Sequence, residues 1–222
     1  MAELPHAPVR ISAFNWVPPF ARGQVRDLRV RWALEEAGVD YSVRALDPRV
    51  ERPEDYWAEQ PFGQVPSYAD HEVSLFETGA IVLHIGERCE ALLPRDPAGR
   101  ARATAWVVAA LNSVEPVIQQ LVSIDIFDPD AAWARERRPE VVRMVEGRLD
   151  RLAAALGDRE HLEGRFTAGN LVMASVLNIL HYTDLVERRP ALAAYRDRCL
   201  ARPAHGRALA AQLATFDAAE AA

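Results

Sequence analysis

Residues 61–87 read PFGQVPSYADHEVSLFETGAIVLHIGE, and this stretch decides the fold. Two short strand-like runs, 65–69 and 72–75, flank turn-forming residues at 70–71, a pattern typical of an antiparallel β-hairpin. An apolar segment with helical spacing follows at once and predicts a helix over residues 77–88. The stretch therefore predicts a ββα unit.

The chain upstream of this unit alternates strand and helix signals. VRISAFN at 9–15 predicts a strand, and apolar residues at helical spacing predict a helix over 25–37. Gly38 follows as a common helix stop, and residues 41–46 predict a second strand. A strand, a helix and a strand in this order predict parallel strands, because parallel neighbours need a crossover connection. The irregular, proline-containing residues 47–61 join this βαβ unit to the hairpin.

The chain downstream of the ββα unit reads as helix after helix. Apolar stripes with helical period predict helices over or near residues 103–121, 141–156 and 171–180. Pro190, at a first-turn position, opens a fourth helix, and residues 204–216 supply a fifth. We therefore predict three parts: a mixed α/β domain at 8–90, a proline-containing linker at 91–99 and an all-helical domain at 100–222.

Composition excludes several classes of function. The net charge of −6 disfavours a generally basic nucleic-acid binder. Every basic residue is arginine, so Schiff-base or lysine-activated chemistry is excluded. Two isolated cysteines, Cys89 and Cys199, form neither a disulfide scaffold nor a CxxC pair, and the histidine spacing predicts no metal site. No signal sequence or long apolar run is recognised, so we expect a cytoplasmic protein without a membrane partner.

Pro66 is open to two interpretations. It stands at the mouth of a strand, where a residue without a backbone N–H is tolerated. Alternatively, a cis Val65–Pro66 bond would turn the Val65 backbone outward and leave its N–H and C=O free for a peptide ligand.

Glu77 and Thr78 are likewise open to two interpretations. Both residues suit the N-terminus of a helix, where a hydroxyl and an acidic group stabilise the free amides. The same free amides and the positive helix end favour a ligand carboxylate, which Thr78 would also bind. Glu77 would then hold an ammonium group, and the pair would recognise an α-amino acid.

Four runs occur in a familiar order: PFGQVPSY, LFETGAIVLHIGE, FTAGNLVMAS and RPAHGRALA. Together they resemble the soluble, cytosolic-type glutathione transferases in a bacterial-like form, and they do not assign a class. The resemblance spans nearly the whole chain. It implies a thioredoxin-like N-terminal domain with a cis-proline, an all-helical C-terminal domain, a homodimer and glutathione as co-substrate.

The resemblance also implies which residues bind glutathione. These are Gln64, Val65, Pro66, Glu77 and Thr78. The Val65 backbone would pair with the cysteinyl part, Glu77 and Thr78 would bind the γ-glutamyl end, and Gln64 would contact the glycine end. Arg49 or Arg52 would add positive charge there.

The catalytic group departs from the family pattern. The family uses a Tyr, Ser or Cys near the first helix, and NWVPPFARGQVRD at 15–27 contains none of them. The absent cysteine argues against thiol exchange through a mixed disulfide. Asn15 and Arg22 are the candidates for stabilising the thiolate. We expect an apolar pocket for the second substrate from Trp16, Phe20 and Trp106.

Two functions follow from these observations. The first is a transferase that activates the glutathione thiol for attack on a hydrophobic electrophile, a detoxification chemistry. The alternative is a transferase-like protein that binds glutathione with little or no catalysis and serves as a binding or interaction module. The missing Tyr, Ser or Cys keeps the alternative open.

Overall fold

The computed structural model describes residues 9–220. Contacts divide the chain into two compact units, one built from residues up to Leu92 and from Arg202 onward, the other from Leu93–Ala201. This division differs from the predicted domains, because the sequence analysis assigns the whole of 100–222 to the helical domain. The outer ends of those predicted domains, residue 8 and residues 221–222, lie outside the described residues.

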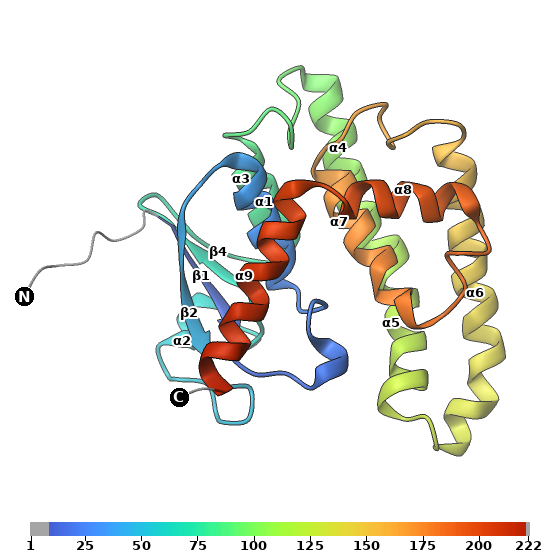
Figure 1. The fold of residues 1–222 in the computed structure, drawn as a ribbon, viewed down its shortest axis with the longest axis horizontal. Helices are drawn as coiled ribbons and strands as arrows, with labels where there is room; N and C mark the ends of the chain where they lie inside the picture. Colours follow the sequence, from blue (N-terminus) through green and yellow to red (C-terminus); the bar gives the residue numbers. More distant parts are fainter. Residues whose placement is uncertain (1–8, 221–222) are drawn as a thin grey trace, which may run out of the picture. The chain divides into compact units, whose positions relative to one another are not determined.

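The first unit is built on a four-stranded mixed sheet with the order β2-β1-β3-β4 (Figure 1). Its strands are β1 (Val9–Phe14), β2 (Tyr41–Leu46), β3 (Ser67–Ala69) and β4 (Ser74–Phe76). β1 is parallel to β2 and antiparallel to β3, and β3 is antiparallel to β4. The predicted βαβ and ββα units are both present, and the fold is thioredoxin-like.

The first unit also contains helical segments that connect and follow its strands. They are η1 (Pro19–Ala21), α1 (Asp27–Ala37), α2 (Tyr56–Glu59), α3 (Thr78–Gly86) and α9 (Pro203–Glu220). α1 ends at Gly38, whose left-handed φ of 65° suits a residue without a Cβ. α1 packs against α3, and the apolar residues Val30, Trp32, Ile81 and Val82 are buried. α1 begins at Asp27, two residues after the start of the helix predicted over 25–37. α2 was not predicted from the sequence.

α9 belongs to the first unit because it packs along α1 (Figure 1). A buried polar cluster joins the two helices. Arg31 Nε donates a 2.7 Å hydrogen bond to Asp27 within α1, and Gln212 Nε2 on α9 donates to the same carboxylate at 2.6 Å. Arg31 also donates to the Thr215 hydroxyl at 3.1 Å. Buried polar groups thus tie α9 to α1.

The second unit is entirely helical. Its elements are α4 (Pro97–Ala109), η2 (Ala110–Val114), α5 (Glu115–Val122), η3 (Ser123–Phe127), α6 (Ala132–Leu156), α7 (Ala168–Asn178), η4 (Ile179–Tyr182) and α8 (Pro190–Leu200). α4 and α8 pack on α7, and α5 packs on α6. The predicted buried central helix is α7, in which Leu171, Val172, Met173 and Ala174 are all fully buried.

The continuous helical stretch Pro97–Phe127 is long and apolar enough, by length and composition, to cross a membrane. No membrane-spanning segment is predicted from the sequence. Half of the stretch's 18-residue apolar window is buried inside the protein, and Val107, Ile118 and Leu121 are core residues. A core helix of a globular protein meets the same criterion, so packing accounts for its apolar composition.

Candidate functional site

The predicted glutathione residues lie at one end of the sheet. β3 begins at Ser67, which pairs with Phe76 at the end of β4. Val65 and Pro66 therefore precede, and Glu77 follows, the same end of the hairpin. β1 runs antiparallel to β3, so its last residues reach this end as well.

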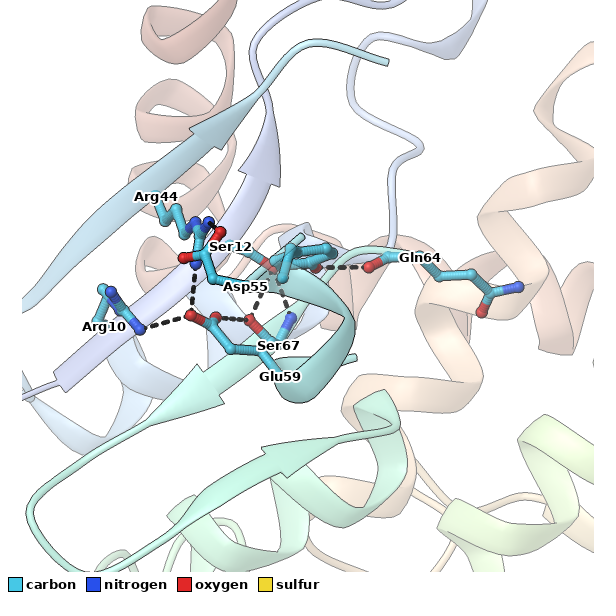
Figure 2. Close-up of polar contacts among 8 residues, drawn as sticks. Arg10, Ser12, Arg44, Asp55, Glu59, Gln64 and Ser67 are labelled. Carbon is cyan, nitrogen blue, oxygen red and sulfur yellow. Dashed lines mark hydrogen bonds and ion pairs between the residues drawn. The ribbon is translucent and has the colours of Figure 1, made fainter. Parts of the chain in front are cut away.

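The Val65–Pro66 segment is buried and its peptide bond is cis. The Val65 side chain forms an apolar cluster with Leu46 and Tyr56. Gln64 is exposed, and Figure 2 shows its side chain extending away from the neighbouring polar groups. The Val65 side chain is buried among apolar groups, so the polar groups of this residue are its backbone N–H and C=O.

Glu77 and Thr78 begin α3. Among residues 9–220, Glu77 is the single non-glycine residue with a positive φ, 69°. The Glu77 side chain is exposed and makes no capping hydrogen bond, whereas Thr78 is buried. The first amides of a helix have no intrahelical partner, so the N-terminus of α3 can accept an anion.

Asn15 directly follows β1 at the same end of the sheet. Its backbone N–H donates to the Leu46 carbonyl at 3.0 Å, which ties the start of the loop to β2. Its side chain makes no hydrogen bond to any other of residues 9–220, and its Oδ1 atom is buried. Asn15 therefore holds an uncommitted amide where the sheet meets the loop.

Arg22 is engaged elsewhere. Its guanidinium pairs with Asp217 and lies 3.8 Å from a carboxylate oxygen of Glu220, both on α9. It also stands 5.4 Å from the ring centre of Phe216. The charge of Arg22 therefore pairs with carboxylates of α9, which makes Arg22 the weaker candidate for stabilising the thiolate.

The aromatic residues of the loop differ in their surroundings. Trp16 is half-buried, and the Arg49 guanidinium lies 5.1 Å from its ring centre. Phe20 is 50% exposed. Trp106 belongs to the helical unit, where its indole N–H donates to Glu163 at 2.9 Å.

Arg49 and Arg52 both contact the segment after β2. The Arg49 guanidinium makes two hydrogen bonds to Asp47 and the Arg49 backbone N–H makes a third, and these bonds lower the pKa of the Asp47 carboxyl to about 2. Arg52 donates to the carbonyls of Asp47 and Gly63, at 2.9 and 3.0 Å. Arg52 therefore braces the loop that leads into Gln64.

Sequence reasoning missed a polar network beneath the Val65–Pro66 segment. The wholly buried Tyr56, on α2, lies with its hydroxyl 2.7 Å from the Ser12 hydroxyl. Ser67 reaches both Ser12 and Glu59 (Figure 2). Ser12 lies on β1, within the strand predicted over 9–15, but its partners lie 44 and 55 residues away. Because α2 is only four residues long, no periodic signal marks it.

Among residues 9–220, no group of three or more His, Cys, Asp or Glu side chains is arranged to hold a metal ion.

Comparison with known proteins assigns the family. Residues 20–87 match the model of the glutathione S-transferase N-terminal domain. Glutathione S-transferase 4 of Zea mays is 30% identical over 212 residues, which cover 87% of this chain and 89% of that protein. The chain belongs to the glutathione S-transferase family.

A second relative agrees with the glutathione S-transferase assignment, and a solved structure shares the fold. A glutathione S-transferase of Hyoscyamus muticus is 29% identical over 201 residues, covering 82% of this chain and 92% of that protein. The crystal structure of a glutathione transferase family member from Pseudomonas fluorescens, with two glutathione molecules bound, superposes with a TM-score of 0.80. It is 19% identical and covers 91% of this chain and 92% of its own, so this likeness bears on the fold.

Proposed function

We propose that this glutathione S-transferase family member is an enzyme that binds glutathione, holds its sulfur as the thiolate and directs it at an electrophilic small molecule. One observation carries the proposal. A buried threonine, the open N-terminus of α3, the Val65 backbone and the uncommitted Asn15 amide all lie at one end of the sheet. The relatives named above are transferases, which favours an enzyme over a protein that only binds glutathione.

Each part of glutathione has a complementary group. The Glu77 carboxylate would pair with the α-ammonium, while the Thr78 hydroxyl and the first amides of α3 would bind the γ-glutamyl carboxylate. The Val65 backbone would pair with the cysteinyl part beside the Pro66 peptide. Gln64, exposed at the loop, would contact the glycine end.

Asn15 is the group we assign to the thiolate. A free thiol has a pKa near 8.5, and each unit of lowering requires about 1.4 kcal/mol of preference for the thiolate. One hydrogen bond to a charged group contributes about 1.5–3 kcal/mol, so a single amide donor is sufficient for one to two units. The Asn15 side-chain amide has no partner among residues 9–220, whereas the terminal nitrogens of the Arg22 guanidinium pair with Asp217 and Glu220 and leave its buried Nε without a partner.

The reaction itself forms one carbon–sulfur bond. The thiolate donates an electron pair to the electrophilic carbon, and the displaced pair leaves with the leaving group or, in an addition, is protonated from water. Trp16 and Phe20 would offer apolar surface to the electrophile. The contribution of Trp106 to this pocket stays a prediction from the sequence.

The test is ultraviolet difference absorbance of the protein–glutathione complex across pH, because the thiolate absorbs where the thiol does not. We expect the bound thiol of the wild-type complex to titrate at least one unit below 8.5. Asn15→Ala should return the thiol pKa toward that of free glutathione, and Arg22→Gln should not. The reverse pattern would assign the thiolate to Arg22. Binding without any shift, together with no turnover of a generic electrophile, would favour the binding-only alternative.

We further propose a cytoplasmic homodimer that acts on small molecules and not on nucleic acid or membranes. The family assignment and the net charge of −6 support this proposal. Sedimentation of the purified protein would test the dimer.

A further inference from the structure

Tyr56 holds the peptide group next to Val65. Its side chain is wholly buried, and its hydroxyl donates a 2.5 Å hydrogen bond to the Gln64 carbonyl. A carbonyl oxygen can only accept, so the phenol must be protonated and must act as the donor. Burial raises the pKa of Tyr56, which keeps the hydroxyl protonated across the physiological range.

This hydrogen bond fixes the direction of a neighbouring amide. The Gln64–Val65 peptide bond is trans. In a planar trans peptide the C=O and N–H groups point in opposite directions. When Tyr56 anchors the Gln64 carbonyl on the inner side, the Val65 N–H is therefore held pointing to the outer side.

The same network anchors the other end of the segment. The Ser67 backbone N–H donates to Ser12 Oγ at 2.6 Å, and Ser12 is hydrogen-bonded to Tyr56. The Ser67 hydroxyl also lies 3.0 Å from Glu59 Oε2. Val65 and Pro66 thus lie between two peptide groups that one buried network holds.

Two arginines in turn fix Glu59. Arg10 and Arg44 donate to its Oε1 atom at 2.7 and 2.6 Å (Figure 2). The Arg44 guanidinium also stands 5.3 Å from the ring centre of Tyr56. Contacts with the charged groups of Arg10 and Arg44 therefore hold the network in place and restrict rotation of the Tyr56 side chain.

We propose that Tyr56 is a positioning residue for glutathione, which aims the Val65 N–H at the cysteinyl part of the tripeptide through the Gln64–Val65 peptide. The inference rests on the proposed function, because it takes glutathione as the ligand. Tyr56 touches no reacting atom, so its effect belongs to binding and not to the chemical step.

Tyr56→Phe removes only the hydroxyl, and the ring still fills the cluster with Leu46 and Val65. We expect the Kd and KM for glutathione to rise about five- to tenfold, the loss of one well-placed hydrogen bond. The kcat at saturating glutathione and the pKa of the bound thiol should stay as in the wild type. The Val65 amide signal in ¹⁵N-valine spectra should move in the ligand-free variant.

Tyr68→Phe is the matched control. Tyr68 is also buried, at 2% exposure, and its hydroxyl donates to Asp70 at 2.9 Å, away from Gln64. If the effect of Tyr56→Phe came only from losing a buried tyrosine hydroxyl, Tyr68→Phe would show the same effect. We expect the control to lower the urea midpoint while leaving the Kd for glutathione and the Val65 signal unchanged.

The outcomes separate the two claims. If the wild type does not bind glutathione in calorimetry, the proposed function fails. If the wild type binds and Tyr56→Phe binds equally well, the inference about Tyr56 is overturned. Should Tyr56→Phe not fold, Ser12→Ala carries the test, because Ser12 is bonded to both Tyr56 and Ser67. An unchanged Kd in Ser12→Ala would overturn the inference, and a rise of threefold or more would support it.

Discussion

Gly169 on α7 lies so close to Trp106 on α4 that a methyl group at Gly169 would stand 2.5 Å from the Trp106 Cβ. The same methyl would stand 3.1 Å from the Ala103 carbonyl oxygen. Both obstacles belong to the body of α4 and not to the end of a flexible side chain. The two helices approach each other at this point because the residue is glycine.

Gly169→Ala should therefore lower the free energy of unfolding by about 1–3 kcal/mol, the usual cost of overpacking a core. Gly147, on α6, is the matched control, since a Cβ there meets nothing within 4 Å. Gly147→Ala should stabilise the helix by about 0.5–1 kcal/mol. Urea unfolding followed by circular dichroism measures both. Equal shifts of the same sign in the two variants would contradict the close approach.

Breaking the buried ion pair of Asp27 and Arg31 should lower the stability of the protein more than breaking an exposed ion pair. Their side chains are 1% and 2% exposed. Asp27→Asn would leave the Arg31 charge buried without its counter-ion, and we expect a loss of about 3–5 kcal/mol in stability. Glu140→Gln breaks the exposed pair with Arg137 and should cost less than about 1 kcal/mol. The urea midpoints of the two variants give the comparison.

The positive φ of Glu77 predicts opposite effects on stability and on binding. A residue with a Cβ costs about 1–2 kcal/mol in the left-handed region, and glycine does not. Glu77→Gly should therefore raise the melting temperature while weakening glutathione binding. Glu77→Gln keeps the Cβ and loses only the charge, so it should weaken binding without the gain in stability. Binding equal to the wild type in both variants would remove Glu77 from the site.

The surroundings of the Asp70 carboxylate make part of the protein's stability depend on pH in the acid range. Its carboxylate is hydrogen-bonded to His84, to the Val73 and Glu72 amides and to the Tyr68 hydroxyl. Burial by itself raises the pKa of Asp70, but these bonds outweigh burial and hold the pKa below its usual range. A lowered folded-state pKa stabilises the protein above the unfolded-state pKa, near 3.9, and the contribution is lost as the pH falls below it.

Asp70→Asn should accordingly be less stable than the wild type at pH 7, by about 2 kcal/mol, and the difference should shrink toward pH 3. Asp47→Asn serves as the control, because the pKa of the partly exposed Asp47 is also lowered, to about 2, but water screens its pairing with the exposed Arg49. Urea midpoints between pH 3 and 7 measure both series. A difference for Asp70→Asn that stays constant with pH would contradict the assignment.

Elements with a strong period were predictable from the sequence. The hairpin and α3 follow from a short alternating run and an apolar helical segment, and α7 follows from its almost wholly apolar composition. Both signals depend on neighbouring residues alone. The proposed binding residues Val65, Glu77 and Thr78 could be put forward for the same reason, since each stands at a recognisable strand or helix start.

Features that depend on distant residues were not predictable. Arg22 looks like a free loop charge in the sequence, because its partner Asp217 lies 195 residues later. Tyr56 lies in an irregular stretch, and its hydrogen-bonded partner Ser12 is 44 residues earlier. No local pattern reports such pairs, so the roles of both residues required the structure.

The attachment of α9 to α1 has a consequence for how the chain is made. A ribosome emits α1 early and α9 last, with the whole of Leu93–Ala201 between them. The all-helical unit is complete in sequence before the α/β unit receives its final helix. During synthesis the α1 face of Asp27 and Arg31 therefore stays uncovered until α9 has emerged, and these two buried charges gain their contacts with Gln212 and Thr215 only then.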